Sequence, residues 1–133
     1  MRVLVIDDEP DLGEFIARLL RRRGHSCEIT TSAEAALFLV GQHEFDLIFS
    51  DLKMPGMSGI DFFESLVACR NPLAARVAFI SGNAMNPPDR QKLERTGRPF
   101  LEKPFDVARF DEFLARVEAS LDGRCPAGSQ IPD

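Results

Sequence analysis

Acidic, hydroxyl and amino side chains directly follow four short apolar segments of this sequence. The side chains concerned are Asp7, Asp8, Asp51, Ser81 and Lys103. If the apolar segments are parallel strands of an open sheet, their carboxyl ends lie along one edge, which is where such sheets bind ligands. We therefore expect three carboxylates, a hydroxyl and an ammonium to meet in one crevice.

Such a crevice needs cations. Two carboxylates about 4 Å apart repel each other by roughly 4 kcal/mol at a surface-like dielectric. Lys103 supplies one positive charge, and a hard divalent ion with oxygen ligands would supply the rest. Mg²⁺ is favoured because it accepts a few carboxylates and still retains waters and a phosphate oxygen. The pattern therefore indicates Mg²⁺-assisted, in-line phosphoryl transfer.

Each of these residues also has a simpler explanation when it is taken alone. Asp8 could be a helix cap, Ser81 with Gly82 an ordinary turn, and Lys103 a surface lysine. Their common position at the ends of four apolar segments is what favours a shared site.

The elements that must position these side chains follow from the apolar periodicity. Short, continuous apolar runs predict five strands, at residues 3–6, 27–30, 47–49, 77–80 and 100–101. Helical spacing and cap residues predict five helices, at residues 10–23, 33–40, 60–67, 87–96 and 107–121, with Gly41 ending the second. Strands that are apolar on both faces indicate a parallel sheet covered by helices, which is an α/β fold.

Composition limits the classes of function. A net charge of −5 argues against direct nucleic-acid binding, and no apolar run is long enough for a membrane span. The chain starts directly with a predicted strand and has three widely spaced cysteines, so we expect no secretory signal and a cytoplasmic location. We expect one domain over residues 1–122 and a disordered polar tail over residues 123–133.

Four segments together resemble the receiver domains of two-component response regulators. They are the acidic Val5-Ile6-Asp7-Asp8-Glu9-Pro10, the segment Asp51-Leu52-Lys53-Met54-Pro55-Gly56-Met57-Ser58-Gly59, the pair Ser81-Gly82, and Lys103-Pro104-Phe105. The similarity covers Arg2 to about Leu121. The residues from Arg98 to Phe105 are also similar to those of receivers in hybrid sensor histidine kinases.

The resemblance implies a flavodoxin-like, doubly wound, five-stranded parallel sheet of order 2-1-3-4-5, with helices on both faces. It implies that Asp51 accepts a phosphoryl group from a phosphohistidine on a histidine kinase or a histidine phosphotransfer protein. Asp8, Asp51 and the Lys53 backbone carbonyl would bind Mg²⁺ directly, with Asp7 helping through water, and Mn²⁺ is an expected substitute. Such a domain is not a conventional turnover enzyme, and its downstream partner is not identified.

The resemblance also implies how the remaining residues respond to phosphate. Ser81 would bind a phosphoryl oxygen, and Lys103 would form an ion pair with the phosphorylated aspartate. The Lys103–Pro104 peptide bond would be cis. Phe100 occupies the position of a switch aromatic that is often tyrosine in this family. Its ring has no hydroxyl, so a plain core aromatic is an equally good interpretation.

Three other functions remain open from the sequence. A haloacid-dehalogenase-type phosphatase also uses an aspartate and Mg²⁺, but it would have Asp-x-Asp on the first strand, where this chain has adjacent Asp7 and Asp8. A degenerate receiver that acts only as an interaction module would lack acidic residues or the lysine, and all are present here. A DNA-binding regulator is disfavoured because no helix-turn-helix segment is left after the receiver is assigned.

Overall fold

The computed structural model describes residues 1–82 and 86–121. Its sheet has five parallel strands in the order 2-1-3-4-5, which confirms the predicted topology. The strands are β1 (Arg2–Ile6), β2 (Ser26–Thr30), β3 (Leu47–Asp51), β4 (Val77–Ser81) and β5 (Phe100–Glu102). The predicted tail at residues 123–133 lies outside the described residues.

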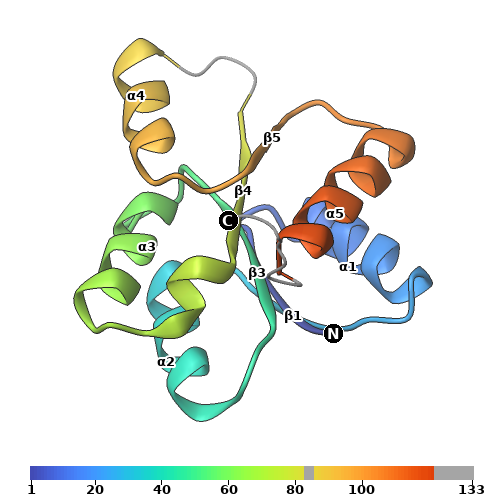
Figure 1. Ribbon diagram of the computed structural model, residues 1–133, viewed down its shortest axis with the longest axis horizontal. Coiled ribbons are helices and arrows are strands. Elements are labelled where there is room, and N and C mark those ends of the chain that lie inside the picture. Colours follow the sequence, from blue (N-terminus) through green and yellow to red (C-terminus); the bar gives the residue numbers. More distant parts are fainter. Residues whose placement is uncertain (83–85, 122–133) are drawn as a thin grey trace.

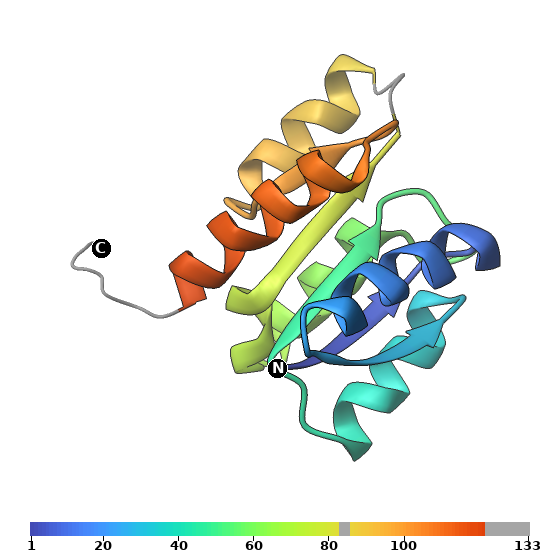
Figure 2. The same ribbon diagram turned by 90° about the vertical axis from the view of Figure 1, so that its right-hand side faces the viewer.

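Helices cover both faces of the sheet (Figures 1 and 2). On one face lie α1 (Pro10–Arg22) and α5 (Val107–Leu121), and on the other lie α2 (Ala33–Gln42), α3 (Gly59–Ala68) and α4 (Pro87–Arg95). The apolar strands predicted a parallel sheet covered by helices, and the doubly wound α/β architecture is the one that the family resemblance implied.

Alternate residues of β1, β3, β4 and β5 enter two separate cores. Val3 and Val5 of β1 pack on the side of α1 and α5, whereas Leu4 and Ile6 pack on the side of α2 and α3. In the first core the Phe49 ring packs against the rings of two α5 phenylalanines, at centroid distances of 5.6 and 6.1 Å. Burial on both faces explains why the buried residues of β1, β3 and β4 are apolar up to the carboxyl ends of these strands, whereas the less buried β2 also carries Ser26 and Glu28.

Cap residues fix where the helices begin. The Ser32 hydroxyl accepts a hydrogen bond from the Ala35 N–H, and the Asp106 carboxylate accepts one from the Arg109 N–H, so a side chain caps the start of both α2 and α5. Gly41 does not end α2 as predicted, because the helix continues through it to Gln42 and then leaves the helical conformation at an extended residue. Glycine inside a helix is tolerated at some cost in stability, so its presence alone does not stop one.

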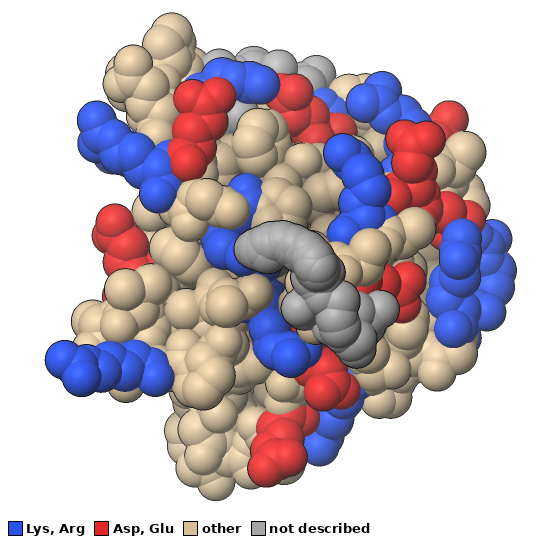
Figure 3. Space-filling model, in the orientation of Figure 1, with Lys and Arg blue, Asp and Glu red and all other residues tan. Residues whose placement is uncertain are grey.

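A short 3₁₀ helix, η1 (Pro72–Arg76), precedes β4 and was not predicted. Within the described part of the chain no helix is long and apolar enough to cross a membrane. On the face drawn in Figure 3, Lys and Arg side chains are interspersed with Asp and Glu rather than gathered in one basic patch.

Candidate functional site

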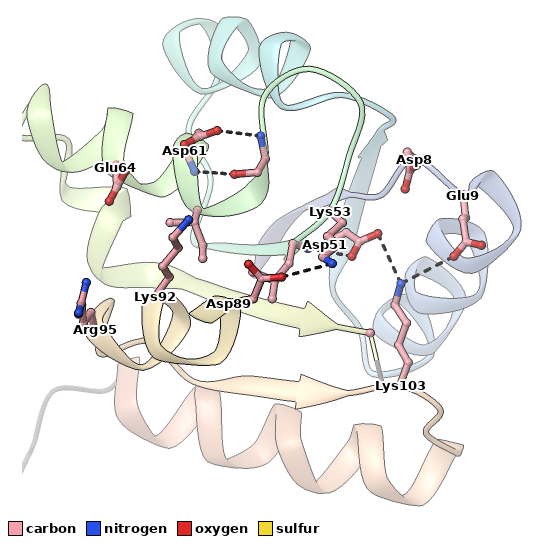
Figure 4. Close-up of a pocket in the computed structure, with 14 residues that line it drawn as sticks. Asp8, Glu9, Asp51, Lys53, Asp61, Glu64, Asp89, Lys92, Arg95 and Lys103 are labelled. Carbon is pink, nitrogen blue, oxygen red and sulfur yellow. Dashed lines mark hydrogen bonds and ion pairs between the residues drawn. The ribbon is translucent and has the colours of Figure 1, made fainter. Parts of the chain in front are cut away.

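The carboxyl ends of β1, β3, β4 and β5 bring the singled-out side chains together. Asp51 is the last residue of β3, and Lys103 follows β5. The Lys103 ammonium (Nζ) lies 3.4 Å from Asp51 Oδ2 and 4.0 Å from Asp7 Oδ2. Figure 4 shows the Lys103 side chain extending between Asp51 and Glu9. The Lys103–Pro104 peptide bond is cis, as the family resemblance implied.

Asp7, Asp8 and Asp51 form a cluster suited to a divalent cation. Each offers one carboxylate oxygen, and the three oxygens lie within 4.8 Å of one another. Asp7 and Asp51 are only 1% and 6% exposed, whereas Asp8 is partly exposed. Asp7 Oδ2 is buried and accepts no hydrogen bond from any described residue. A buried oxygen without a partner is costly, and an oxygen-only donor set fits a hard cation such as Mg²⁺.

The crowding changes how these carboxylates titrate. Burial raises the pKa of Asp7 from 3.8 to about 6; the charge of Asp51 acts in the same direction, while the Glu9 N–H and Lys103 oppose it. Burial also raises the pKa of Asp51, against the opposing effects of Lys103 and of the Leu52 N–H, which donates to Asp51 Oδ1 at 2.8 Å. A bound cation would favour the charged form of both carboxylates and lower their pKa values.

Ser81 and Phe100 lie at opposite ends of neighbouring strands β4 and β5. The Ser81 hydroxyl is fully buried and makes no hydrogen bond to any described residue, so a donor inside the protein is left unused. Phe100 is partly buried, and the Arg90 guanidinium covers its ring at 5.5 Å from the centroid. The assignments of Ser81 as a phosphoryl ligand and of Phe100 as a switch remain predictions.

A pocket of about 760 Å³ extends from these acidic residues into the space between α3 and α4 (Figure 4). Its α3 wall includes Asp61 and Glu64, and its α4 wall includes Asp89, Lys92 and Arg95. The pocket gives a ligand direct access to Asp51, which also lines it.

Lys53 lines the same pocket two residues beyond Asp51. Its ammonium lies 3.3 Å from Asp89 Oδ2, in the first turn of α4. This contact was not predicted, because the spacing of Lys53 and Asp89 in the sequence says nothing about how α4 is placed. Metal binding by the Lys53 backbone carbonyl remains a prediction.

Sequence reasoning also missed Gly59 and Glu9. A Cβ atom on Gly59 would lie 2.1 Å from the Asp51 carbonyl oxygen, and the Gly59 N–H donates to the Leu52 carbonyl at 2.9 Å. Glycine is therefore required where α3 begins against the backbone of Asp51. Glu9 Oε1 lies 3.7 Å from Lys103 Nζ, so a fourth carboxylate shares that ammonium. The acidic segment containing Glu9 was noted, but its spacing could not reveal this contact.

Comparison with known proteins supplies independent information. The family model described as the response regulator receiver domain matches residues 3–115. The transcriptional regulatory protein KdpE of Mycobacterium tuberculosis is 34% identical over 119 residues, which cover 90% of this chain and 50% of that protein. The sensory/regulatory protein RpfC of Xanthomonas campestris is 30% identical over 122 residues, covering 90% of this chain and 17% of that protein.

A solved structure agrees with these sequence relatives. The receiver domain of the Francisella response regulator 1452 superposes with a TM-score of 0.75 at 26% identity, covering 91% of this chain and 96% of that one. The chain thus matches nearly all of an isolated receiver domain but half or less of the two curated relatives above.

Proposed function

This chain belongs to the response regulator receiver family, and from that premise we propose that it accepts a phosphoryl group on Asp51 in a Mg²⁺-dependent reaction. Receivers of this family serve two-component signalling and are not conventional turnover enzymes. One observation carries the proposal: Lys103 Nζ lies 3.4 Å from Asp51 Oδ2, at the edge of a cluster of three carboxylates. An interaction module without phosphoacceptor activity would not require this arrangement.

Asp8, Asp51 and the Lys53 carbonyl would hold the cation directly, and Asp7 would support it through a water molecule. When bound, the cation neutralises carboxylate charge and the charge that develops on the transferred phosphoryl group. Asp7 Oδ2, which accepts no hydrogen bond from the described residues, and the three oxygens within 4.8 Å of one another support this set of ligands.

Asp51 would act as the nucleophile in an in-line displacement. A carboxylate oxygen of Asp51 forms a bond to phosphorus while the phosphorus–nitrogen bond of a phosphohistidine breaks. The imidazole leaves with the electron pair and is protonated by solvent. The Leu52 N–H, which donates to Asp51 Oδ1 at 2.8 Å, orients the carboxylate for the attack.

Ser81 and Lys103 would receive the new group. The Ser81 hydroxyl has no partner among the described residues, and a phosphoryl oxygen would provide one. Hydrogen bonds to charged groups contribute about 1.5–3 kcal/mol each, so two such contacts contribute roughly 3–6 kcal/mol. Moving a two-state equilibrium from 1:99 to 99:1 needs about 5.5 kcal/mol. The free energy of these contacts is therefore large enough to drive a conformational switch at the edge strand β5, which carries Phe100.

The phosphoryl donor would be a histidine kinase or a histidine phosphotransfer protein in the cytoplasm. RpfC, a sensory/regulatory protein, contains a segment similar to this chain, which supports a place in such a relay. Because the chain spans half or less of these curated relatives, its output partner is left open.

The test uses acetyl phosphate, a small donor that needs no partner protein. We expect one phosphoryl group per chain, detected by intact mass, with Mg²⁺ or Mn²⁺ and none in chelator. Asp51→Asn should abolish the labelling, whereas Asp11→Asn, which changes an exposed carboxylate in the first turn of α1, should leave it unchanged. Unchanged labelling of Asp51→Asn would refute this acceptor, and steady release of phosphate from many phosphate esters would favour a phosphatase instead.

A further inference from the structure

Helix α4 is held to the domain by few side chains. Of its nine residues, Leu93 alone is buried, and the others are exposed or partly exposed. Its remaining side-chain contacts include Arg90, which pairs with Glu102 of β5 at 3.4 Å and covers the ring of Phe100. A surface helix with one buried apolar side chain is easily displaced, because little burial opposes its movement.

The Lys53–Asp89 ion pair connects this helix to the phosphoacceptor loop. Asp89 is well positioned for the contact, since its backbone N–H donates to the Asn86 cap at 2.9 Å. Among the described residues, Lys53 and Asp89 form no ion pair with any other side chain. Figure 4 shows the pair beside Asp51, at the point where the pocket passes from the acidic cluster to the space between α3 and α4.

We propose that Lys53 is a phosphoryl-sensing residue: its ammonium binds Asp89 in the unphosphorylated protein and exchanges Asp89 for a phosphoryl oxygen when Asp51 is modified. The exchange would release the first turn of α4. This inference rests on the proposed function of Asp51, and it assigns a new role to the Lys53 side chain, separate from the metal-binding role predicted for its backbone carbonyl.

Charge gives the direction of the exchange. With a divalent cation bound, the three carboxylates and Lys103 balance its charge, and Glu9 adds one further negative charge beside Lys103. A phosphoryl group of about −1.5 to −2 charges then replaces the single charge of Asp51 and leaves the site net negative. Lys53 is 74% exposed and on a flexible stem, so its ammonium can move with little loss of packing. The more highly charged phosphoryl group competes with the single negative charge of Asp89 for the same ammonium.

The test measures binding of beryllofluoride, a phosphoryl analogue, to the full chain with Mg²⁺, by ¹⁹F NMR. Exchange predicts opposite effects of the two partners. Asp89→Asn frees Lys53 and should tighten analogue binding by about 1.5-fold to 5-fold, the range that one surface ion pair supports. Lys53→Gln removes the ammonium and should weaken binding, and Lys53→Arg should restore it. Glu64→Gln, which removes a carboxylate on the α3 wall of the same pocket, should bind like the wild type.

Hydrogen exchange of the α4 amides provides the second measurement. Without analogue, Asp89→Asn and Lys53→Gln should both speed exchange in α4 by a similar factor, because each breaks the resting ion pair. If Asp89→Asn and Lys53→Gln change the affinity for the analogue equally and in the same direction, the proposed exchange is wrong and the Lys53–Asp89 ion pair is purely structural. Analogue that fails to bind the wild type, or binds equally to Asp51→Asn, would instead refute the proposed function of Asp51.

Discussion

Neutralising Asp7 should stabilise the metal-free protein, and the gain should grow with pH. Asp7 is 1% exposed, its Oδ2 has no hydrogen-bond partner among the described residues, and burial raises its pKa from 3.8 to about 6. Because the pKa of Asp7 is higher in the folded than in the unfolded protein, its contribution to the free energy of unfolding is fully present below pH 3.8. That contribution is lost as the pH rises through 6.

The magnitude follows from the shift. A difference of about two pKa units corresponds to roughly 3 kcal/mol between the charged and neutral forms. In chelator, the free energy of unfolding of Asp7→Asn should exceed that of the wild type by about 1 kcal/mol at pH 4.5 and about 3 kcal/mol at pH 7.5. The asparagine can still accept the hydrogen bond that the Glu9 N–H donates to Asp7 Oδ1 at 2.8 Å.

Urea unfolding at a series of pH values from 4.5 to 8, in chelator, measures this difference. Asp11→Asn controls for the loss of one negative charge, since Asp11 is exposed in the first turn of α1. Saturating Mg²⁺ should cancel or reverse the advantage of Asp7→Asn, because the cation binds the wild-type carboxylates more tightly. A gain that stays constant from pH 4.5 to 8 would refute the reasoning, because it could not come from the ionisation of Asp7.

Three further perturbations test other parts of the site. Adding Mg²⁺ at about 100 times its dissociation constant should raise the free energy of unfolding by about 2.7 kcal/mol, and Asp51→Asn should lose most of this gain in the same titration. Gly59→Ala should lower the free energy of unfolding, measured with urea, by about 1–3 kcal/mol, because its Cβ would lie 2.1 Å from the Asp51 carbonyl oxygen. An unchanged free energy of unfolding would show that α3 can shift freely. Ser81→Ala should leave the free energy of unfolding of the unmodified protein nearly unchanged, because the Ser81 hydroxyl has no hydrogen-bond partner among the described residues. The same substitution should remove much of the stabilisation gained with beryllofluoride, and full retention of that gain would exclude Ser81 as a ligand.

The fold and the convergence of the acidic residues were predictable because strand burial and polar strand ends are both visible in the sequence. Val3–Ile6 and Leu47–Phe49 are apolar on both faces, so each polar residue that follows must lie at an end of the strand. Parallel strands then place these ends along one edge of the sheet. The meeting of Asp51 and Lys103 in one crevice followed from this argument, whereas the ion pair between them was implied by the family resemblance.

The contacts that the sequence did not predict depend on distances between separate elements. Gly59 looked like one more turn residue, and only the approach of α3 to the Asp51 backbone shows why a side chain cannot fit there. The Lys53–Asp89 pair depends on where a loosely held α4 lies over the pocket. The spacing of apolar residues indicates which faces of helices and strands are buried. η1 has no buried residue and no such spacing, so it could not be inferred from the sequence.

The site is built at a cost in stability that its ligands can offset. Asp7 Oδ2 and Ser81 Oγ are both buried, and neither makes a hydrogen bond with any described residue. They flank Asp51 at the carboxyl ends of the neighbouring strands β1 and β4, where a cation would satisfy one atom and a phosphoryl oxygen the other. Filling these positions with apolar residues would stabilise the unliganded fold and remove the difference in binding on which a switch depends. We therefore expect the domain with cation and phosphoryl group bound to be its most stable form. Part of the binding free energy would come from giving these two buried atoms partners, and part would be used to reposition the weakly packed α4.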